Sequence, residues 1–209
     1  TMLGEHGRSI TKTLFTKPAL AMAKVGITPN MLTVTGTVLS VVVAVCTLPQ
    51  GHFLLGVGLL LIVLFGDSFD GILARATGTS SPFGAFLDSC LDRLTDAAVF
   101  GSLTVWAALH MPAGTQRTLT VSFAVACVGL GACVSYVRAR AESVGADAHK
   151  GLAERTDRLI IGGLGALAVG FGLSTWCITV ALGVVALAAF ITVVQRILAV
   201  RSHFAKQAK

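Results

Sequence analysis

The stretch FGDSFDGILARATGTSSPFGAFLDSCLDRLTD, residues 65–96, places acidic side chains in the middle of a hydrophobic chain. Asp67, Asp70, Asp88 and Asp92 lie within it, and apolar runs flank it on both sides. A carboxylate inside a membrane helix costs several kcal/mol unless it faces a partner, an ion or water. Four such residues close together therefore indicate a functional site rather than a packing feature.

The flanking composition is typical of a membrane protein. Hydrophobic residues make up 54% of the 209 residues and charged residues only 12%, far from the average of soluble domains. Because a span needs about 20 residues, the second and third runs reach that length only by continuing through the acidic stretch. The predicted fold is an all-α integral membrane protein with six transmembrane helices, within residues 31–48, 53–75, 84–109, 118–137, 159–173 and 175–195.

The charges predict how these helices are oriented. With both termini in the cytoplasm, fifteen of the sixteen Lys and Arg residues lie on the cytoplasmic side, and Arg117 lies opposite. This distribution follows the positive-inside rule for a multi-pass protein of the cell membrane. All ten acidic residues fall in the same half, so we expect the active site on the cytoplasmic side. The net charge of +6 suits anionic lipid headgroups, and no surface typical of nucleic-acid binding is present.

The chain divides into an arm, residues 1–27, and one membrane domain, residues 28–209. Apolar residues in the arm recur at roughly helical spacing between lysines, which predicts an amphipathic helix lying in the membrane interface. Thr28, Pro29 and Asn30 then open the first membrane helix, since threonine can cap a helix and proline suits its first position. The same residues could also line the active site.

The acidic residues of the central stretch fall on two helix faces, because helix neighbours recur at spacings of three and four. The short connection makes the two helices antiparallel neighbours, so their faces can meet. Four converging carboxylates repel one another unless a cation is present, and such hard oxygen ligands favour Mg²⁺, Mn²⁺ or Ca²⁺. A pair of these ions suits displacement at phosphorus. A divalent-cation transporter is the alternative hypothesis, and Asp96 is interpreted as a surface partner of Arg93.

These residues also carry a family resemblance. The pattern Asp67-x2-Asp70-Gly71-x2-Ala74-Arg75-x8-Gly84-x3-Asp88-x3-Asp92 matches every fixed position of the CDP-alcohol phosphotransferase signature, so the chain resembles that family. Its members are homodimers in which two divalent ions, here expected to be Mg²⁺ or Mn²⁺, hold the diphosphate of a CDP-linked donor. The resemblance implies that the metal ligands are Asp67, Asp70, Asp88 and Asp92.

Further roles follow from the same resemblance. Asp92 is implied to be the base that takes a proton from the acceptor hydroxyl. The residues that would bind the CDP-linked donor are Pro29, Asn30, Gly71, Ala74, Arg75 and Gly84.

Arginines elsewhere in the chain bear on the acceptor. Guanidinium groups bind phosphate bidentately, so several around one cavity favour an acceptor that already carries phosphate. The plainer interpretation is that these arginines only follow the positive-inside rule. The stretches SYVRARAE (135–142) and ERTDRLIIG (154–162) resemble the actinobacterial phosphatidylinositol-phosphate synthases of that family.

That resemblance implies transfer from CDP-diacylglycerol to inositol 1-phosphate with release of CMP. It also implies an acceptor-phosphate site made by Ser135, Arg138, Arg155 and Arg196. Within Ser135–Arg140, Arg138 is favoured because it lies three residues after Ser135 on one helical face. Glycerol 3-phosphate, which would give phosphatidylglycerol phosphate, is the alternative acceptor.

Overall fold

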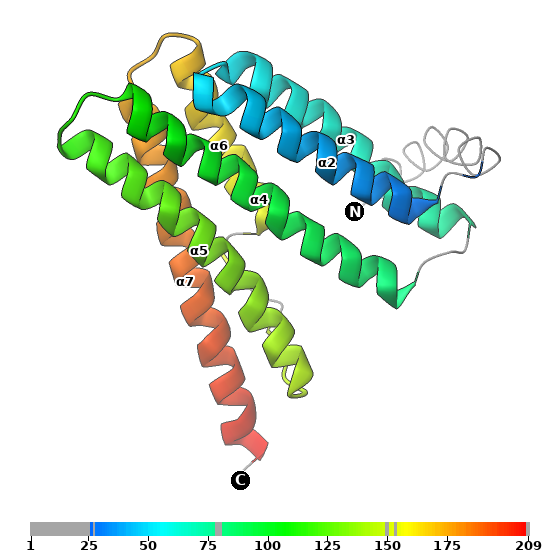
Figure 1. Ribbon diagram of the computed structural model, residues 1–209. Helices are drawn as coiled ribbons and strands as arrows, with labels where there is room; N and C mark the ends of the chain where they lie inside the picture. The colour runs from blue at the N-terminus through cyan, green and yellow to red at the C-terminus, as the bar shows by residue number, and fades with distance from the viewer. Residues whose placement is uncertain (1–25, 27, 78–80, 149–150, 153, 208–209) are drawn as a thin grey trace, which may run out of the picture. The chain divides into compact units, whose positions relative to one another are not determined.

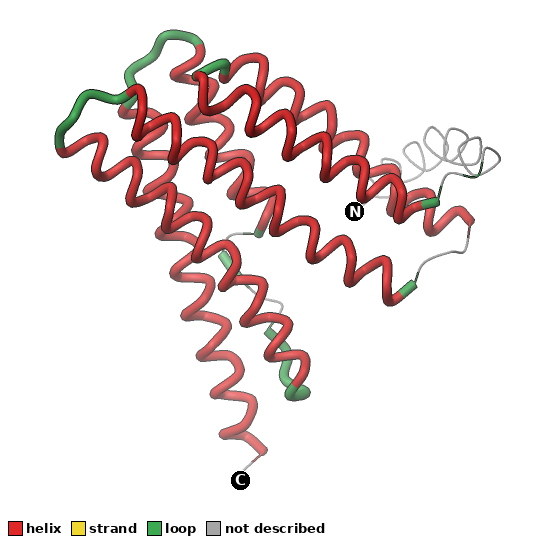
Figure 2. Tube along the Cα trace, viewed as in Figure 1, coloured by secondary structure: helices red, strands yellow, loops and turns green. Residues whose placement is uncertain are grey.

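The computed structural model is built from long helices joined by short connections. It describes residues 26, 28–77, 81–148, 151–152 and 154–207, with the backbone alone for residues 65 and 67–77. No strand occurs within these ranges (Figure 2). The elements, labelled in Figure 1 where there is room, are α2 (Pro29–Thr47), the 3-10 turn η1 (Leu48–Gln50), α3 (Phe53–Thr77), α4 (Pro82–His110), α5 (Thr115–Ser143), α6 (Arg155–Gly170) and α7 (Trp176–Gln207).

All six apolar runs are confirmed as helices, although several ends differ from the prediction. Helix α5 continues to Ser143 and α7 to Gln207, well past the last apolar residues of their runs. Apolarity marks where a helix can lie in lipid, whereas arginine and lysine are good helix formers that extend it into the headgroup region. The predicted interfacial helix of the arm lies outside the described residues, apart from Gly26.

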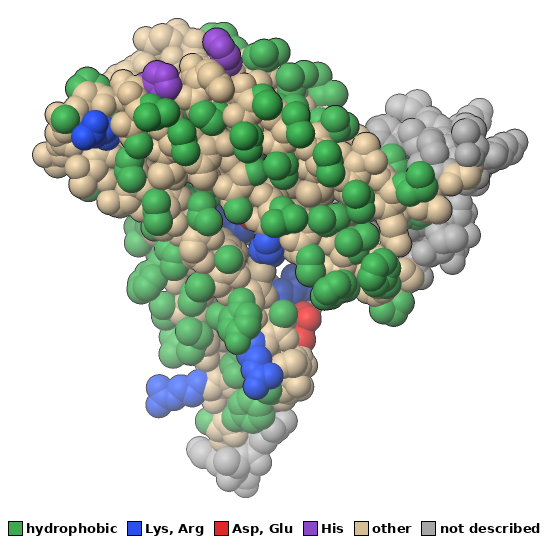
Figure 3. Space-filling model, in the orientation of Figure 1, with side chains coloured by type: hydrophobic (Ala, Val, Ile, Leu, Met, Phe, Trp, Pro, Cys, Tyr) green, Lys and Arg blue, Asp and Glu red, His purple; other side chains and the backbone are tan. Residues whose placement is uncertain are grey.

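Three of the helices in the described part of the chain are long and apolar enough to cross a membrane. They are α2 with η1 (Pro29–Gln50), α5 (Thr115–Ser143) and α7 (Trp176–Lys206), and Phe53–Leu64 is a shorter apolar stretch. Hydrophobic side chains cover much of the face seen in Figure 3. Exposed Val38 and Val42 on α2, and Leu187 and Phe190 on α7, belong to these outward apolar surfaces. Extensive apolar exposure of this kind suits contact with lipid.

Two helices, α2 and α4, begin with the same N-cap: a hydroxyl residue followed by proline. The Thr28 hydroxyl accepts a hydrogen bond from the Met31 N–H at 3.3 Å, and the Ser81 hydroxyl accepts one from the Gly84 N–H at 3.0 Å. In both cases proline follows the capping residue, where its missing N–H costs nothing. The predicted start of the first helix at Thr28 and Pro29 is therefore confirmed.

The chain forms two compact units, residues 1–43 with 58–95, and residues 44–57 with 96–209. In the second unit, α5 and α6 both pack against α7, and Figure 1 shows α5 and α7 side by side. The Thr120 and Thr179 hydroxyls are hydrogen-bonded at 2.8 Å across the α5–α7 contact. Leu182 and Val185 of α7 are completely buried.

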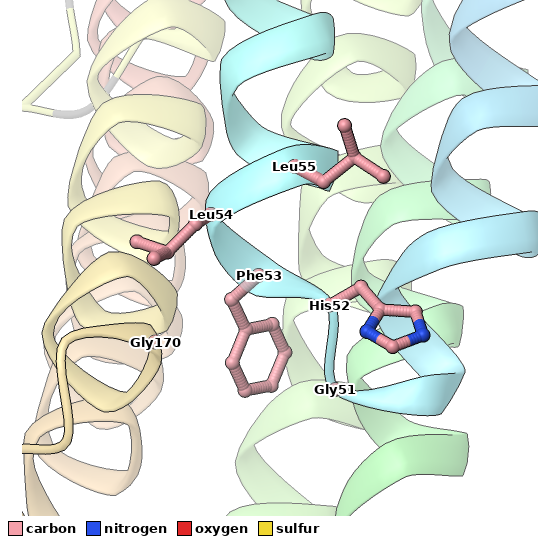
Figure 4. A pocket seen from close by; sticks show the side chains of 6 residues that line it. All are labelled: Gly51, His52, Phe53, Leu54, Leu55 and Gly170. Atoms are coloured by element: carbon pink, nitrogen blue, oxygen red, sulfur yellow. The ribbon is translucent and has the colours of Figure 1, made fainter.

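A pocket of about 360 Å³ lies where α3 begins, lined by Gly51, His52, Phe53, Leu54, Leu55 and Gly170 (Figure 4). The Phe53 ring, 2% exposed, packs edge-on against the Trp106 ring with centroids 4.8 Å apart. Gly170 ends α6, whereas Arg155 begins it, so the pocket and the charged end of α6 are separated by that helix, roughly 22 Å. The pocket therefore takes no part in the charged site described below.

Close packing of α6 on α7 depends on Gly165. A Cβ added there would lie 2.5 Å from the Ala181 Cβ and 3.2 Å from the Ile178 Cα, whereas one added at Gly163 would meet Val57 Cγ1 at an ordinary 3.6 Å. We expect Gly165→Ala to lower the free energy of unfolding by about 1–3 kcal/mol through overpacking. Thermal unfolding in detergent measures this, with Gly163→Ala as the matched control. Equal stability of the two variants would contradict the packing described.

Candidate active site

The four aspartates of the signature lie on two helices of the first unit. Asp67 and Asp70 belong to the second half of α3, and Asp88 and Asp92 to the first half of α4. Asp88 and Asp92 are both half-buried and one helical turn apart, so their side chains share a face. The side chains of Asp67 and Asp70, like those of Ala74 and Arg75, lie outside the described part of the chain.

This set of donors fits a divalent cation. It consists of carboxylates, the hard oxygen ligands that Mg²⁺ and Mn²⁺ prefer. Partial burial of Asp88 and Asp92 raises the cost of their mutual repulsion, which a cation relieves. Arg93 gives partial compensation, because its Nη2 lies 3.7 Å from the Asp92 Oδ2. No group of three or more metal-binding side chains occurs among those described, which do not include Asp67 and Asp70.

Two of the residues expected to bind the donor are close together. A Cβ added at Gly84 would lie 3.2 Å from the Asn30 Oδ1 and 3.3 Å from the Ser81 Oγ. The start of α2 and the start of α4 thus meet at Gly84, where an added side chain would press against both polar atoms. Pro29 precedes Asn30 at the first position of α2.

The second unit holds a buried ion network centred on Asp96. This residue is 4% exposed, and each carboxylate oxygen accepts a hydrogen bond from a different arginine. The Arg155 Nε donates to Oδ1 at 3.2 Å, and the Arg158 Nη2 donates to Oδ2 at 2.9 Å. The interpretation of Asp96 as a surface partner of Arg93 is therefore wrong, since its partners come from the first turn of α6.

Arg158 is the more deeply buried of the two arginines. It is 1% exposed, and its Nε and Nη1 have no hydrogen-bond partner among the described residues. Its guanidinium lies against α5, where a Cβ added at Gly131 would be 3.7 Å from the Arg158 Cζ. A buried cation of this kind is tolerated only beside a counter-charge, which Asp96 supplies.

Arg196 joins this region from α7. It is 5% exposed, and its Nη1 donates a hydrogen bond of 2.6 Å to the Val134 carbonyl of α5. Ser135, the next residue of α5, is half-buried. The charges of Arg138 and Arg158, and the opposite charges of Glu154 and Glu142, also act on the Arg196 guanidinium. The structure thus brings Arg196 beside the α5 segment that holds Ser135. We call Arg155, Arg158 and Arg196 the arginine cluster.

Arg138 differs from the other expected acceptor residues. Its Nε donates to the Glu142 Oε1 at 3.1 Å, and the two side chains are 46% and 48% exposed. An exposed pair one turn apart contributes little to stability. Arg140 is also exposed and donates to the Ser143 hydroxyl at 3.0 Å.

Sequence reasoning missed Asp96 and Arg158 as parts of one network. Asp96 continues the four-residue spacing of Gly84, Asp88 and Asp92 along α4, and Arg158 lies three residues after Arg155. These spacings place each residue on the same helical face as an expected site residue. That shared face was the available signal.

Comparisons with known proteins agree with this chemistry. A family model described as CDP-alcohol phosphatidyltransferase matches residues 26–204. The phosphatidylinositol phosphate synthase of Mycobacteroides abscessus is 42% identical over 186 residues, covering 88% of this chain and 82% of the relative. The Corynebacterium glutamicum enzyme of the same name is 37% identical over 207 residues, covering 99% and 93%.

Solved structures of a further relative are also similar. The Mycobacterium tuberculosis phosphatidylinositol phosphate synthase with CDP-DAG bound has a TM-score of 0.84 and 34% identity, covering 90% of this chain and 94% of that one. The same enzyme in complex with manganese and citrate has a TM-score of 0.83 and 36% identity, covering 89% and 88%.

The carboxylates of the first unit predict a direct effect on metal affinity. We expect Asp88→Asn to weaken Mn²⁺ binding by at least about tenfold, because loss of an outer-shell partner alone can cost that much. Titration followed by the electron paramagnetic resonance signal of free Mn²⁺ measures the affinity. Asp157→Asn is the matched control, since it alters an exposed carboxylate of the α6 capping box. Unchanged affinity in Asp88→Asn would contradict the assignment.

Proposed function

The chain belongs to the CDP-alcohol phosphatidyltransferase family, and on that premise we propose that it transfers the phosphatidyl group of CDP-diacylglycerol to a hydroxyl of inositol 1-phosphate. The products are phosphatidylinositol phosphate and CMP. The observation that carries the choice of acceptor is the arginine cluster. Two of its members, Arg158 and Arg196, are at least nine-tenths buried. Arginines that only set the membrane orientation do not need to be buried.

The charge balance of this region supports a phosphorylated acceptor. The cluster carries three positive charges, and Asp96, bonded to two of its members, supplies one buried negative charge. Glu142 and Glu154 also act on Arg196, but both are exposed, so solvent screens them. The buried guanidinium groups therefore favour an anionic ligand. Arg155 and Arg196 can donate hydrogen bonds to a phosphate through their planar guanidinium groups, and the Ser135 hydroxyl can donate another. Arg138, exposed beside Glu142, completes the acceptor-phosphate site that we propose.

Asp92 is the base in this proposal. It takes the proton of the acceptor hydroxyl, whose oxygen attacks the phosphorus that bears diacylglycerol, and the bond from that phosphorus to the CMP oxygen breaks. Two Mg²⁺ or Mn²⁺ ions, when bound by Asp67, Asp70, Asp88 and Asp92, neutralise the diphosphate and make CMP a better leaving group.

The donor is bound by residues at the starts of α2 and α4 and near the end of α3. The approach of Asn30 to Gly84 supports a pocket in which a small residue leaves room for the ligand. The proposed donor-binding residues are Pro29, Asn30, Gly71, Ala74, Arg75 and Gly84.

The membrane arrangement is also part of the proposal. All six helices cross the membrane, both termini and the site face the cytoplasm, and residues 1–27 form an arm ahead of a single domain of residues 28–209. The distribution of lysine and arginine supports this orientation. The protein acts as a homodimer, as the family resemblance implies.

A panel of acceptors tests the function. We expect purified protein with CDP-diacylglycerol and Mg²⁺ or Mn²⁺ to release CMP with inositol 1-phosphate, and not with free inositol, glycerol 3-phosphate or serine. The reason is that the arginine cluster binds the phosphate of inositol 1-phosphate, which free inositol and serine lack. The expectation for glycerol 3-phosphate rests on the relatives, which are phosphatidylinositol phosphate synthases. Asp92→Asn, which lacks the base, serves as the inactive control.

Two outcomes would change the proposal. Release of CMP with glycerol 3-phosphate alone would keep the transfer chemistry and make the inositol assignment wrong. Absence of CMP with every acceptor, in protein that binds Mn²⁺, would favour the divalent-cation transporter. Metal flux into sealed vesicles would then test that alternative.

The proposed role of Arg196 predicts that a substitution there weakens binding of the acceptor but not of the donor. Lysine keeps the charge but lacks the planar fork, so we expect Arg196→Lys to raise KM for inositol 1-phosphate about tenfold, the equivalent of one charge-assisted hydrogen bond. KM for CDP-diacylglycerol should stay constant in the same CMP-release assay. Arg201→Lys, at an exposed position of the same helix, is the matched control. An equal rise in both KM values would contradict the role in acceptor binding.

A further inference from the structure

The carboxylate of Asp96 has no role in the transfer step, yet it is buried and bonded to two arginines, one of which belongs to the proposed acceptor site. It is 4% exposed, and its two oxygens are engaged by Arg155 at 3.2 Å and Arg158 at 2.9 Å. We propose that Asp96 is the positioning residue of the acceptor site, which holds Arg155 in the orientation that binds the acceptor phosphate. This inference rests on the proposed function.

The two arginines bonded to Asp96 differ in what they can reach. The Arg155 side chain is 22% exposed, whereas that of Arg158 is 2% exposed. Of the two arginines bonded to Asp96, Arg155 is therefore the more accessible to a ligand. Arg158 instead lies between α5 and Asp96, near Gly131, and fixes the second carboxylate oxygen. Arg158 thereby fixes the Asp96 carboxylate through Oδ2, while Oδ1 of the same carboxylate fixes Arg155.

The atoms involved suit this role. Asp96 contacts Arg155 through Nε, so it does not occupy the edge formed by the two Nη atoms, which can bind a phosphate bidentately. A free arginine side chain has about 2 kcal/mol of rotamer entropy, part of which binding must remove. An anchor at Nε removes part of it in advance, and preorganisation of this kind strengthens binding. Arg196 is fixed in a comparable way by the Val134 carbonyl.

Because Asp96 is also the counter-charge of a buried cation, its replacement alone would threaten folding. The test therefore compares Arg158→Met with the double variant Asp96→Asn/Arg158→Met. Both lack the buried cation, and they differ only in the carboxylate. CMP release gives the apparent KM for inositol 1-phosphate and for CDP-diacylglycerol, and thermal unfolding in detergent gives the stability.

We expect the double variant to show a KM for inositol 1-phosphate about tenfold above that of Arg158→Met, because one charge-assisted hydrogen bond is lost. KM for CDP-diacylglycerol should be the same in both. Adding Arg155→Lys to the double variant should then cost much less than in the wild type, since residues that act together are not additive. Asp157→Asn, an exposed carboxylate of α6, controls for the loss of negative charge.

An unchanged acceptor KM in the double variant, or an equal rise in both KM values, would overturn the positioning role. If the double variant does not fold, the wild type is compared with Asp96→Glu, which keeps the charge but displaces it. A selective rise in acceptor KM then supports the inference, and its absence overturns it. Failure of the wild type to use inositol 1-phosphate would instead reject the proposed function, so the two failures are distinct.

Discussion

The cost of burying charge in an apolar protein governs the arrangement of this molecule. Arg158, 1% exposed, would be unstable without a counter-charge, and Asp96 lies 2.9 Å away. Removing one partner of such a pair typically costs 3–5 kcal/mol, a large part of the stability of most domains. The packing of α4, α5 and α6 around this pair is therefore tied to electrostatics as much as to apolar contact.

Helix α4 joins the two kinds of chemistry along one face. Asp88, Asp92 and Asp96 recur every four residues of a continuous helix, Pro82–His110. Each step advances about 6 Å along the axis, so proposed metal ligand, base and positioning residue occupy successive turns. The four-residue spacing that predicts metal ligands thus continues to Asp96, whose partners are arginines and whose proposed role is different.

The helices were largely predictable from sequence, since they depend on local patterns, whereas the acidic metal site stays a prediction. Apolar runs locate the helices, and Thr28 with Pro29 marks the start of α2, as its hydrogen bond to Met31 confirms. The partners of Asp96 were not predictable in this way. Arg93 is three residues away in sequence, but the observed partners, Arg155 and Arg158, are 59 and 62 residues away. Such pairs depend on how helices pack, which spacing within one helix does not reveal.

Burial also favours one of two interpretations of the arginines that sequence could not separate. The positive-inside rule places arginines at the cytoplasmic ends of helices whether or not they bind anything, and the exposure of Arg138 beside Glu142 does not distinguish that general role from acceptor binding. Arg158 and Arg196 do not fit that general role, because burying a guanidinium for orientation alone would be costly. Asp96 is bonded to two of the three guanidinium groups, whereas Glu142 and Glu154, which also act on Arg196, are exposed to solvent. An acceptor that brings its own phosphate adds negative charge beside the buried arginines, whereas a neutral alcohol adds none. The cost of burying charge therefore also favours a phosphorylated acceptor.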